Sequence, residues 1–486
     1  MNPLKKLASQ TAVYGLSQIV GRFVNYLLVP LHTALFDTAE FGINTLMYSY
    51  VTFFNVLLTY GMETAFFRYS QKHENRAEVY STALKSIIST SLFFGVLIGL
   101  FSAPIAQLIN IPEHPEYVTY FACIMALDAI SAIPFAYLRQ QNKPLKFALV
   151  KNLNIFTNIL LNLYFLVLCP YVYKTQFGLT LPFYDGTLHI GYVFIANLFA
   201  SIITIPFLSK EIIAIKNASF NKELWREMLV YGLPLMVVGF AGMINETLDR
   251  IIISYVYTNV EEGLQATGIY GANYKLSILM SLFIQAFRYA AEPFFFNHAK
   301  TQDKRDIYAK VMNYFTLVCL VLFLIVTLYI DVFKHFINDR YWEGLHVVPV
   351  LLLANMFLGI YYNLSIWYKL SDHTNKGAVI SLIGAAITLI ANFVLVPLLG
   401  YTGSAWATLI CYLSMVIICY LLGMKYYPIP YQVKRISTYI AAVLVIYFSI
   451  NLIPSDGLMI KHLISALAIT SFGAVAFLLE RKNTFT

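Results

Sequence analysis

The sequence predicts an all-α polytopic membrane protein with about fourteen transmembrane helices. Hydrophobic residues make up 59% of the 486 residues and charged residues only 12%, against roughly 45–50% and about 25% in soluble domains. The mean hydropathy is +0.67. The apolar residues form long runs separated by short loops, and the lysines and arginines concentrate in every second loop. A soluble chain of this length could not bury so much apolar surface, whereas lipid tails accept it.

Fourteen segments are long enough to cross a bilayer, since a helix needs about 20 apolar residues to span roughly 30 Å of hydrocarbon. Helices are favoured over a β-barrel because the runs are continuous rather than ten-residue alternations. The first run is too long for a signal-peptide core, and no small-residue cleavage site follows it, so we interpret it as a retained helix. The predicted spans are 10–35, 41–65, 81–108, 117–138, 147–172, 188–208, 228–256, 266–296, 308–330, 346–368, 377–399, 402–423, 436–453 and 459–479.

Positive charge predicts the orientation of these spans. An even number of spans places both termini on one side, and the loops and tails of that side carry 25 lysines and arginines, Lys151 among them. The opposite loops carry only Lys174, Lys334, Arg340 and Lys461. By the positive-inside rule the rich side is cytoplasmic. We therefore predict a protein of the inner (cytoplasmic) membrane of the cell with both termini in the cytoplasm.

Several function classes are disfavoured by composition. The net charge of +8 is spread thinly over many loops, which argues against a nucleic-acid partner. The sequence has no phosphate-binding glycine loop and no metal-ligand spacing, so we predict no cofactor and no metal. The five cysteines lie in apolar runs and are interpreted as buried apolar residues. The longest outer connections, 173–187 and 331–345, leave no room for an extramembrane catalytic domain, which argues against an enzyme.

The chain repeats itself weakly after six spans. Repeats with this offset share their orientation, which predicts parallel lobes related by a pseudo-twofold axis. We therefore predict an N-lobe at 1–209 with helices 1–6, a C-lobe at 210–423 with helices 7–12, and helices 13–14 with a cytoplasmic tail at 424–486. The repeated segments are Tyr14-Gly15-Leu16 with Tyr231-Gly232-Leu233, Gly42-Ile43-Asn44 with Gly268-Ile269-Tyr270, and Phe66-Phe67-Arg68 with Phe294-Phe295-Phe296.

Four segments in this order, Tyr231-Gly232-Leu233-Pro234, Asp249-Arg250, Gly268-Ile269-Tyr270 and Pro293-Phe294-Phe295-Phe296, resemble the bacterial polysaccharide transporter (oligosaccharide flippase) family. That family belongs to a superfamily that includes multidrug and toxin extrusion pumps and lipid II flippases. The resemblance implies two six-helix lobes around a V-shaped cavity, and transport of polyprenyl-pyrophosphate-linked sugars. Drug pumps of the superfamily usually have twelve helices, so the two additional helices favour its lipid-carrier branches.

Basic residues inside the spans are the candidate substrate-binding residues, because a charge at mid-bilayer costs at least about 2.5–3.5 kcal/mol on insertion scales. They are Arg22, Arg250, Lys275 and Arg288, and we predict that they line one cationic cavity. Arginine presents a forked donor and lysine a point charge, both of which suit pyrophosphate oxygens. Gln18 and Asn25 share a helical face with Arg22. This polar stripe favours a water-filled cavity over a buried polar cluster.

Acidic residues offer these cations alternative partners. Glu246 precedes Arg250 by four residues, with Asp249 beside them, and Glu292 follows Arg288 by four residues, so both arginines could form ion pairs within their helices. Lys275 has no acidic residue at helical spacing, although it could snorkel outward from its span.

Two further carboxylates lie in the predicted N-lobe. Asp128, in the middle of the fourth span, could couple transport to a cation such as Na⁺ or a proton. It could equally stay neutral or pair with Arg22. Glu63 lies near the cytoplasmic end of the second span, shortly before Arg68, and is interpreted as a solvated or gate pair.

We predict a flippase that carries undecaprenyl-pyrophosphate-linked oligosaccharide units across the cytoplasmic membrane by alternating access. Its partners would be this lipid-linked substrate, the lipid bilayer and the polysaccharide polymerase machinery of O-antigen, capsule or exopolysaccharide synthesis. The alternatives within transport are a lipid II flippase and a cation-coupled multidrug exporter, and a basic cavity argues against the latter. The alternative from another class is a membrane polymerase or ligase acting on lipid-linked sugars.

Overall fold

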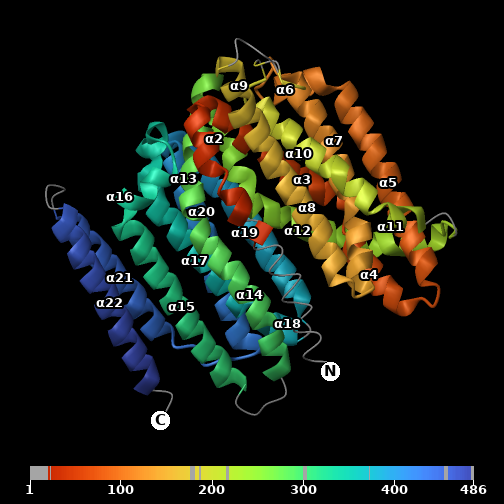
Figure 1. Cartoon of the computed structure of the whole chain (residues 1–486). Coiled ribbons are helices and arrows are strands. Elements are labelled where there is room, and N and C mark those ends of the chain that lie inside the picture. Colours follow the sequence, from red (N-terminus) through yellow and green to blue (C-terminus); the bar gives the residue numbers. More distant parts are fainter. Residues whose placement is uncertain are drawn as a thin grey trace. The chain divides into compact units, whose positions relative to one another are not determined.

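The computed structural model describes residues 20–482 except 22, 176–180, 185, 187, 215–217, 299–303, 372 and 454–457. Every regular element within these residues is a helix (Figure 1). Eleven helices are long and apolar enough to cross a membrane, and three shorter apolar helices cover Phe23–Leu35, Gly191–Phe207 and Ile278–Tyr289. Helices lie over the described part of every predicted span, and the predicted all-α membrane class is confirmed.

The chain folds into two compact units, Met1–Gly268 and Ile269–Thr486, and the boundary falls within α13 (Val260–Leu276). The helices of the first unit before α13 are α2 (Val29–Leu35), α3 (Thr38–Thr59), α4 (Met62–Lys72), α5 (Arg76–Leu100), α6 (Ser102–Leu108), α7 (Pro115–Gln140), α8 (Pro144–Leu163), the π-helix η1 (Tyr164–Leu168), α9 (Cys169–Thr175), α10 (Gly191–Phe207), α11 (Ser209–Ile213) and α12 (Lys222–Val256). The helices of the second unit after α13 are α14 (Ile278–His298), α15 (Lys304–Leu328), α16 (Ile330–Phe333), the 3₁₀-helices η3 (Lys334–Phe336) and η4 (Asp339–Val347), α17 (Val348–Leu364), α18 (Ile366–Leu370), α19 (Thr374–Leu399), α20 (Tyr401–Tyr426), α21 (Val433–Asn451) and α22 (Leu458–Lys482).

Helix starts in the first unit follow local sequence signals. α7 and α8 each begin with a proline, which lacks the N–H that a first helical residue would leave unpaired. At the start of α3, the backbone N–H of Glu40 donates to the Asp37 carboxylate at 2.8 Å, and the Glu40 carboxylate accepts from the Asp37 N–H at 3.2 Å. This reciprocal capping box ends the preceding loop sharply.

Several predicted spans are broken helices rather than continuous ones, among them the second and the eighth. The second span, 41–65, is interrupted between α3 and α4, where Tyr60 and Gly61 have φ angles of +33° and +71°. The interruption lies against α12: a Cβ atom on Gly232 would be only 2.8 Å from the Tyr60 carbonyl oxygen, so the two backbones meet where glycine allows it. The eighth span, 266–296, is interrupted at Ser277, between α13 and α14.

Two glycines of the predicted repeat, Gly42 of α3 and Gly268 of α13, pack against each other. A Cβ atom on Gly268 would lie 2.9 Å from the Gly42 nitrogen and would also collide with the Thr38 carbonyl oxygen. A Cβ atom on Gly42 would collide with the Leu264 carbonyl oxygen. The glycine of the repeated Gly-Ile step is therefore needed in both copies for the same close backbone approach.

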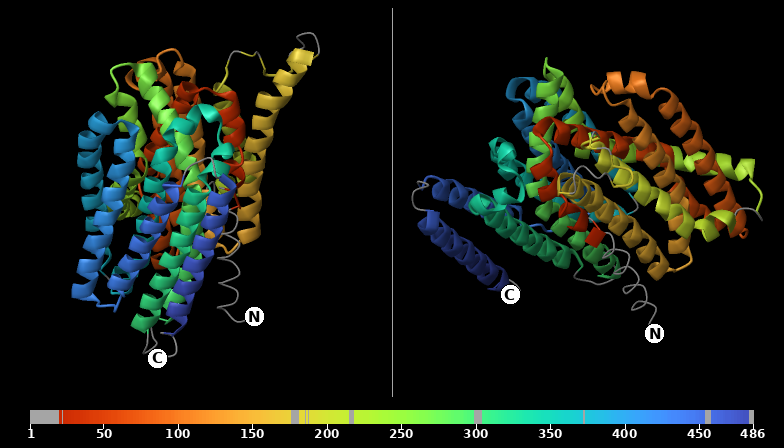
Figure 2. Two further views of the ribbon diagram at one scale, coloured as in Figure 1. Left: turned by 90° about the vertical axis from the view of Figure 1, so that its left-hand side faces the viewer. Right: turned by 45° about the horizontal axis from the view of Figure 1, so that its top comes forward.

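In the second unit, α21 and α22 lie side by side and pack on α15 (Figures 1 and 2). Glu480 is buried at their contact and forms an ion pair with Arg435 at 2.9 Å. The hydroxyl of Tyr439 donates to Glu480 at 2.9 Å, and the Asn313 amide donates to it at 3.2 Å. One carboxylate thus ties three helices together.

Replacing Glu480 with leucine should loosen this three-helix contact. Arg435, Tyr439 and Asn313 would lose a charged hydrogen-bond partner, and one such bond contributes about 1.5–3 kcal/mol. We expect the midpoint of thermal unfolding in detergent to fall by several degrees, whereas leucine at the exposed Lys434 should leave it unchanged. Equal midpoints for the two variants would show that Glu480 does not stabilise the contact.

Candidate functional site

A polar cavity of about 260 Å³ lies inside the first unit, among α3, α7, α8 and α10. Amide, hydroxyl and charged side chains dominate its wall, although all four helices are otherwise rich in apolar residues. A polar interior in an apolar bundle has to be hydrated or occupied, because unpaired polar groups are unfavourable there. The lining residues are Asn55, Thr59, Asp128, Ala129, Ser131, Phe135, Lys151, Asn154, Asn197, Ser201 and Thr204.

Asp128 places a carboxylate in this cavity. Its neighbours Ala126 and Ala129 on α7 are buried, but the side chain of Asp128 itself is exposed, because it opens into the cavity. The hydroxyl of Ser201 on α10 donates a hydrogen bond of 2.9 Å to the Asp128 carboxylate. A charge-assisted bond of this kind stabilises the ionised form of the acid. Arg22, the alternative partner from the sequence, lies outside the described residues.

Lys151 is a lining residue that the sequence reasoning missed. The charge pattern assigns it to a cytoplasmic loop, but α8 begins at Pro144, which places Lys151 about 10 Å into the helix at 1.5 Å per residue. Its ammonium lies 4.2 Å from the centroid of the Phe135 ring and faces the cavity. Lys151 and Asp128 interact electrostatically across the cavity rather than through a direct ion pair. The sequence signal for this position was Pro144, because a proline is common at the first position of a helix.

Neutral polar side chains complete the wall. The Asn154 amide donates to the Thr204 hydroxyl at 3.1 Å, which joins α8 to α10. The Asn197 amide donates to the Tyr48 hydroxyl of α3 at 3.0 Å. The side-chain oxygen of Asn55 is buried and accepts no hydrogen bond from the described residues. The cavity therefore offers an acceptor for a bound water or solute.

A second charged pair, Glu63 of α4 and Arg139 of α7, lies next to the cavity. The two side chains form an ion pair, and both act electrostatically on Lys151. Glu63 is thus part of an ion pair, and its partner is Arg139. The guanidinium of the nearby Arg68 lies over the Tyr231 ring of α12, 4.3 Å from its centroid. Glu63, Arg139 and Lys151 thus place charges of both signs at this end of the unit.

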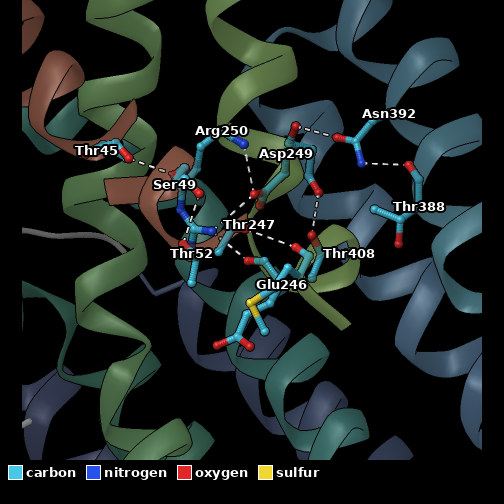
Figure 3. A network of polar contacts seen from close by, with 12 residues as sticks. Thr45, Ser49, Thr52, Glu246, Thr247, Asp249, Arg250, Thr388, Asn392 and Thr408 are labelled. Atoms are coloured by element: carbon cyan, nitrogen blue, oxygen red, sulfur yellow. Dashed lines mark hydrogen bonds and ion pairs between the residues drawn. The ribbon is translucent and has the colours of Figure 1, made fainter. Parts of the chain in front are cut away.

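Arg250, predicted to bind substrate, is buried on α12 and charge-compensated. Its guanidinium forms an ion pair with Asp249 at 3.2 Å and donates to the main-chain carbonyl of Glu246 at 2.6 Å (Figure 3). The guanidinium thus contacts the backbone of Glu246, four residues earlier in the helix. A paired, buried guanidinium has less capacity for a phosphate than an exposed one.

The other predicted cations are distributed over both units. Lys275 and Arg288 belong to the second unit and are half-buried, and the Arg288 guanidinium lies over the Tyr362 ring, 4.2 Å from its centroid. Asn25 is exposed, whereas Arg22 and Gln18 lie outside the described residues, as does the side chain of Glu292. The shared cationic cavity accordingly stays a prediction.

A neutral polar cluster on α19 and α20 of the second unit was also missed. The Ser404 hydroxyl donates to the Asn392 side-chain oxygen at 2.7 Å. The Asn392 amide donates to the Thr388 carbonyl at 2.8 Å (Figure 3). The Thr408 hydroxyl donates to the Ser404 carbonyl at 2.9 Å. Their spacing of four residues within apolar helices was the only sequence signal.

Comparison with known proteins places this fold in context. The profile of a family described as polysaccharide biosynthesis protein matches residues 7–298. An uncharacterized membrane protein of Methanocaldococcus jannaschii is 25% identical over 449 residues, which cover 85% of this chain and 83% of that protein. A solved lipid II flippase MurJ in an inward closed conformation matches with a TM-score of 0.66 at 16% identity, over 96% of this chain and 98% of that chain. An inward-facing multidrug resistance MATE family transporter matches with a TM-score of 0.63 at 13% identity, over 88% and 95%.

Proposed function

Because this chain belongs to the polysaccharide biosynthesis protein family, we propose that it is a flippase for undecaprenyl-pyrophosphate-linked oligosaccharide units. The observation that carries the proposal is the likeness in fold to a lipid II flippase over 96% of this chain and 98% of that chain. The drug-transporter fold covers less of the chain, 88%. The two additional C-terminal helices support a lipid-linked substrate rather than a soluble one.

The chemistry of a pyrophosphate headgroup explains why cations belong in such a protein. Moving a multiply charged anion into hydrocarbon is very unfavourable unless fixed positive charges replace its hydration. Lys275 and Arg288 are only half-buried, which leaves them able to meet an anionic headgroup. Arg22 lies outside the described residues, and its proposed role rests only on its place in the first predicted span. Arg250 contributes mainly as a buried pair with Asp249.

In this proposal the protein lies in the cytoplasmic membrane with both termini in the cytoplasm and acts by alternating access, without enzymatic turnover. The polar headgroup and its sugars would occupy an aqueous cavity while the polyprenyl tail stays in the bilayer. The flipped unit would pass to polysaccharide polymerase machinery. A lipid II flippase is the second candidate, since the likeness in fold to a solved lipid II flippase favours that function equally.

Deleting the gene and extracting lipids tests the substrate. We expect an undecaprenyl-linked oligosaccharide to accumulate on the cytoplasmic leaflet, and expression of the wild-type chain to clear it. Accumulation of lipid II instead would establish the second candidate. Accumulation of neither lipid would overturn both.

Alanine at Lys275 or Arg288 should slow this clearance about tenfold or more, because one lost charge-assisted hydrogen bond corresponds to about 1.5–3 kcal/mol. Alanine at the exposed Lys310 of α15 is the matched control and should clear the lipid at the wild-type rate. Wild-type clearance by the Lys275 and Arg288 variants, at equal amounts of protein in the membrane, would remove both residues from the substrate site.

A further inference from the structure

We propose that the second unit binds the headgroup of an anionic phospholipid at the predicted cytoplasmic surface of the membrane. The site consists of three cations, Arg305 at the start of α15, Lys376 at the start of α19 and Lys425 at the end of α20, around the rings of Tyr426 and Tyr427. This inference goes beyond the proposed function, because the ligand is a resident lipid of the membrane and is not transported. We call these five residues the basic cluster.

Two neighbouring tyrosine rings bring the three cations together. The ammonium of Lys376 lies 5.3 Å from the centroid of the Tyr426 ring, and that of Lys425 lies 5.7 Å from the same centroid. The guanidinium of Arg305 lies 4.8 Å from the centroid of the Tyr427 ring. A ring attracts each cation, whereas cations gathered around the same two rings repel one another. A bound anion would offset this repulsion.

Within the part of the chain that the structure describes, no carboxylate neutralises the basic cluster. None of its three cations forms an ion pair with a described residue. Asp306 follows Arg305 directly, but its side chain is exposed and does not pair with the guanidinium. Arg435, ten residues after Lys425, is different because it pairs with Glu480. The basic cluster therefore keeps positive charge that an anionic ligand can meet.

The Tyr426 ring is held in place by its own packing. The buried Trp367 stacks on it with ring centroids 6.0 Å apart and an angle of 7° between the planes. The indole N–H of Trp367 donates to the Cys419 carbonyl at 3.1 Å, which anchors the stack on α20. The ring of His373 lies 5.3 Å from Tyr426. Because the ring is already ordered, a ligand that meets the cations around it pays little additional ordering entropy.

Exposed apolar side chains continue from these cations along the helices. On α20, Leu421 and Ile417 precede Lys425 by four and eight residues, which places all three on one face. Leu421 is 61% exposed and Ile417 49% exposed. On α19, Val379 follows Lys376 by three residues and is 47% exposed. A ligand with a phosphate and acyl chains matches both the cations and these faces, whereas a soluble phosphate matches the cations alone.

The expected selectivity follows from charge. Each lysine or arginine near an anionic leaflet contributes about 1 kcal/mol, or roughly fivefold in affinity. Phosphatidylglycerol carries a net negative charge, and phosphatidylcholine has the same phosphate but no net charge. Three cations should therefore favour phosphatidylglycerol by at least about tenfold.

Native mass spectrometry of the full-length protein, released from detergent micelles after titration with dioleoyl-phosphatidylglycerol or dioleoyl-phosphatidylcholine, tests the site. We expect wild type to retain phosphatidylglycerol at least about tenfold more tightly than phosphatidylcholine. The triple variant Arg305→Gln, Lys376→Gln, Lys425→Gln should lose this preference. The matched control removes the same charge from exposed cations of the first unit, by Lys210→Gln, Lys222→Gln and Arg226→Gln, and should bind as wild type does.

Two single variants test whether the ring positions the cations. Tyr426→Leu removes the ring and leaves every charge in place, so it should weaken binding of phosphatidylglycerol severalfold. Tyr426→Phe keeps the ring and should bind as wild type does. Retention of phosphatidylcholine and the thermal midpoint, measured on the same preparations, distinguish a lost site from a damaged fold.

Each other outcome would overturn the assignment. Equal retention of the two lipids by wild type would show that the basic cluster does not recognise charge. An equal loss in the control variant would mean that the overall charge of the protein attracts the lipid. Displacement of phosphatidylglycerol by inorganic phosphate at equal ionic strength would make the basic cluster a site for a soluble anion. The measurement requires no transport, so its result is independent of the proposed function.

Discussion

Replacing Gly268 with valine should prevent the protein from accumulating in the membrane in a folded form. A Cβ atom there meets the Thr38 carbonyl oxygen and the Gly42 nitrogen, which are backbone atoms and cannot rotate away. Overpacking typically costs about 1–3 kcal/mol, and a clash between two backbones belongs at or above the upper end of that range. We expect a large loss of protein in the membrane fraction and a lower thermal midpoint for what remains.

Gly242→Val in α12 is the control for the effect of placing valine in a helix without a clash, because nothing lies within 4 Å of a Cβ atom built on Gly242. Gly242→Val should therefore have little effect. Gly42→Val should reproduce the defect of Gly268→Val, since its Cβ atom collides with the Leu264 carbonyl on the other side of the same contact. Normal amounts and stability of Gly268→Val would show that the two helices do not need this close approach.

Replacing Asp249 with alanine should destabilise the first unit strongly. Arg250 would stay buried on α12 without the carboxylate that now lies 3.2 Å from its guanidinium. Breaking a buried ion pair by removing one partner costs about 3–5 kcal/mol, because it leaves an uncompensated charge. Thermal unfolding of the purified protein in detergent should show a marked fall in the midpoint.

The double variant Asp249→Leu with Arg250→Met separates this charge effect from packing. Removing both charges should restore much of the stability, since buried pairs are often replaceable by apolar residues. Alanine at Glu223, an exposed carboxylate on the same helix, should be neutral. A double variant as unstable as Asp249→Ala would mean that the loss comes from shape or from other partners of Asp249 instead.

The membrane helices could be predicted from sequence because length and hydrophobicity alone decide them. A bilayer imposes about 20 apolar residues on every crossing, so the runs themselves give the spans to within a few residues. The break at Tyr60 and Gly61 could not be predicted in this way, because it depends on contact with Gly232 more than 150 residues later in the chain. Tertiary packing, not local preference, decides that turn.

Likewise, one part of the candidate site could be predicted from the sequence and another part could not. Asp128 stood out because a lone carboxylate amid apolar residues is unfavourable in a membrane. Lys151 did not, because it was counted with the charges of a cytoplasmic loop, although it lies seven residues after α8 begins at Pro144. That Glu63 pairs with Arg139 rather than Arg68 depends on how α4 packs on α7, which no spacing along one helix reveals.

The contact between Gly42 and Gly268 also bears on the ancestry of the chain. These glycines stand at corresponding positions of the predicted repeat, and each one touches the other. A twofold axis brings equivalent positions of two copies together in this way, as in an isologous dimer. A half-length ancestor that paired with its own duplicate would have needed only one such glycine. After gene duplication and fusion, glycine would be required at both positions, so the two codons would have to be preserved together.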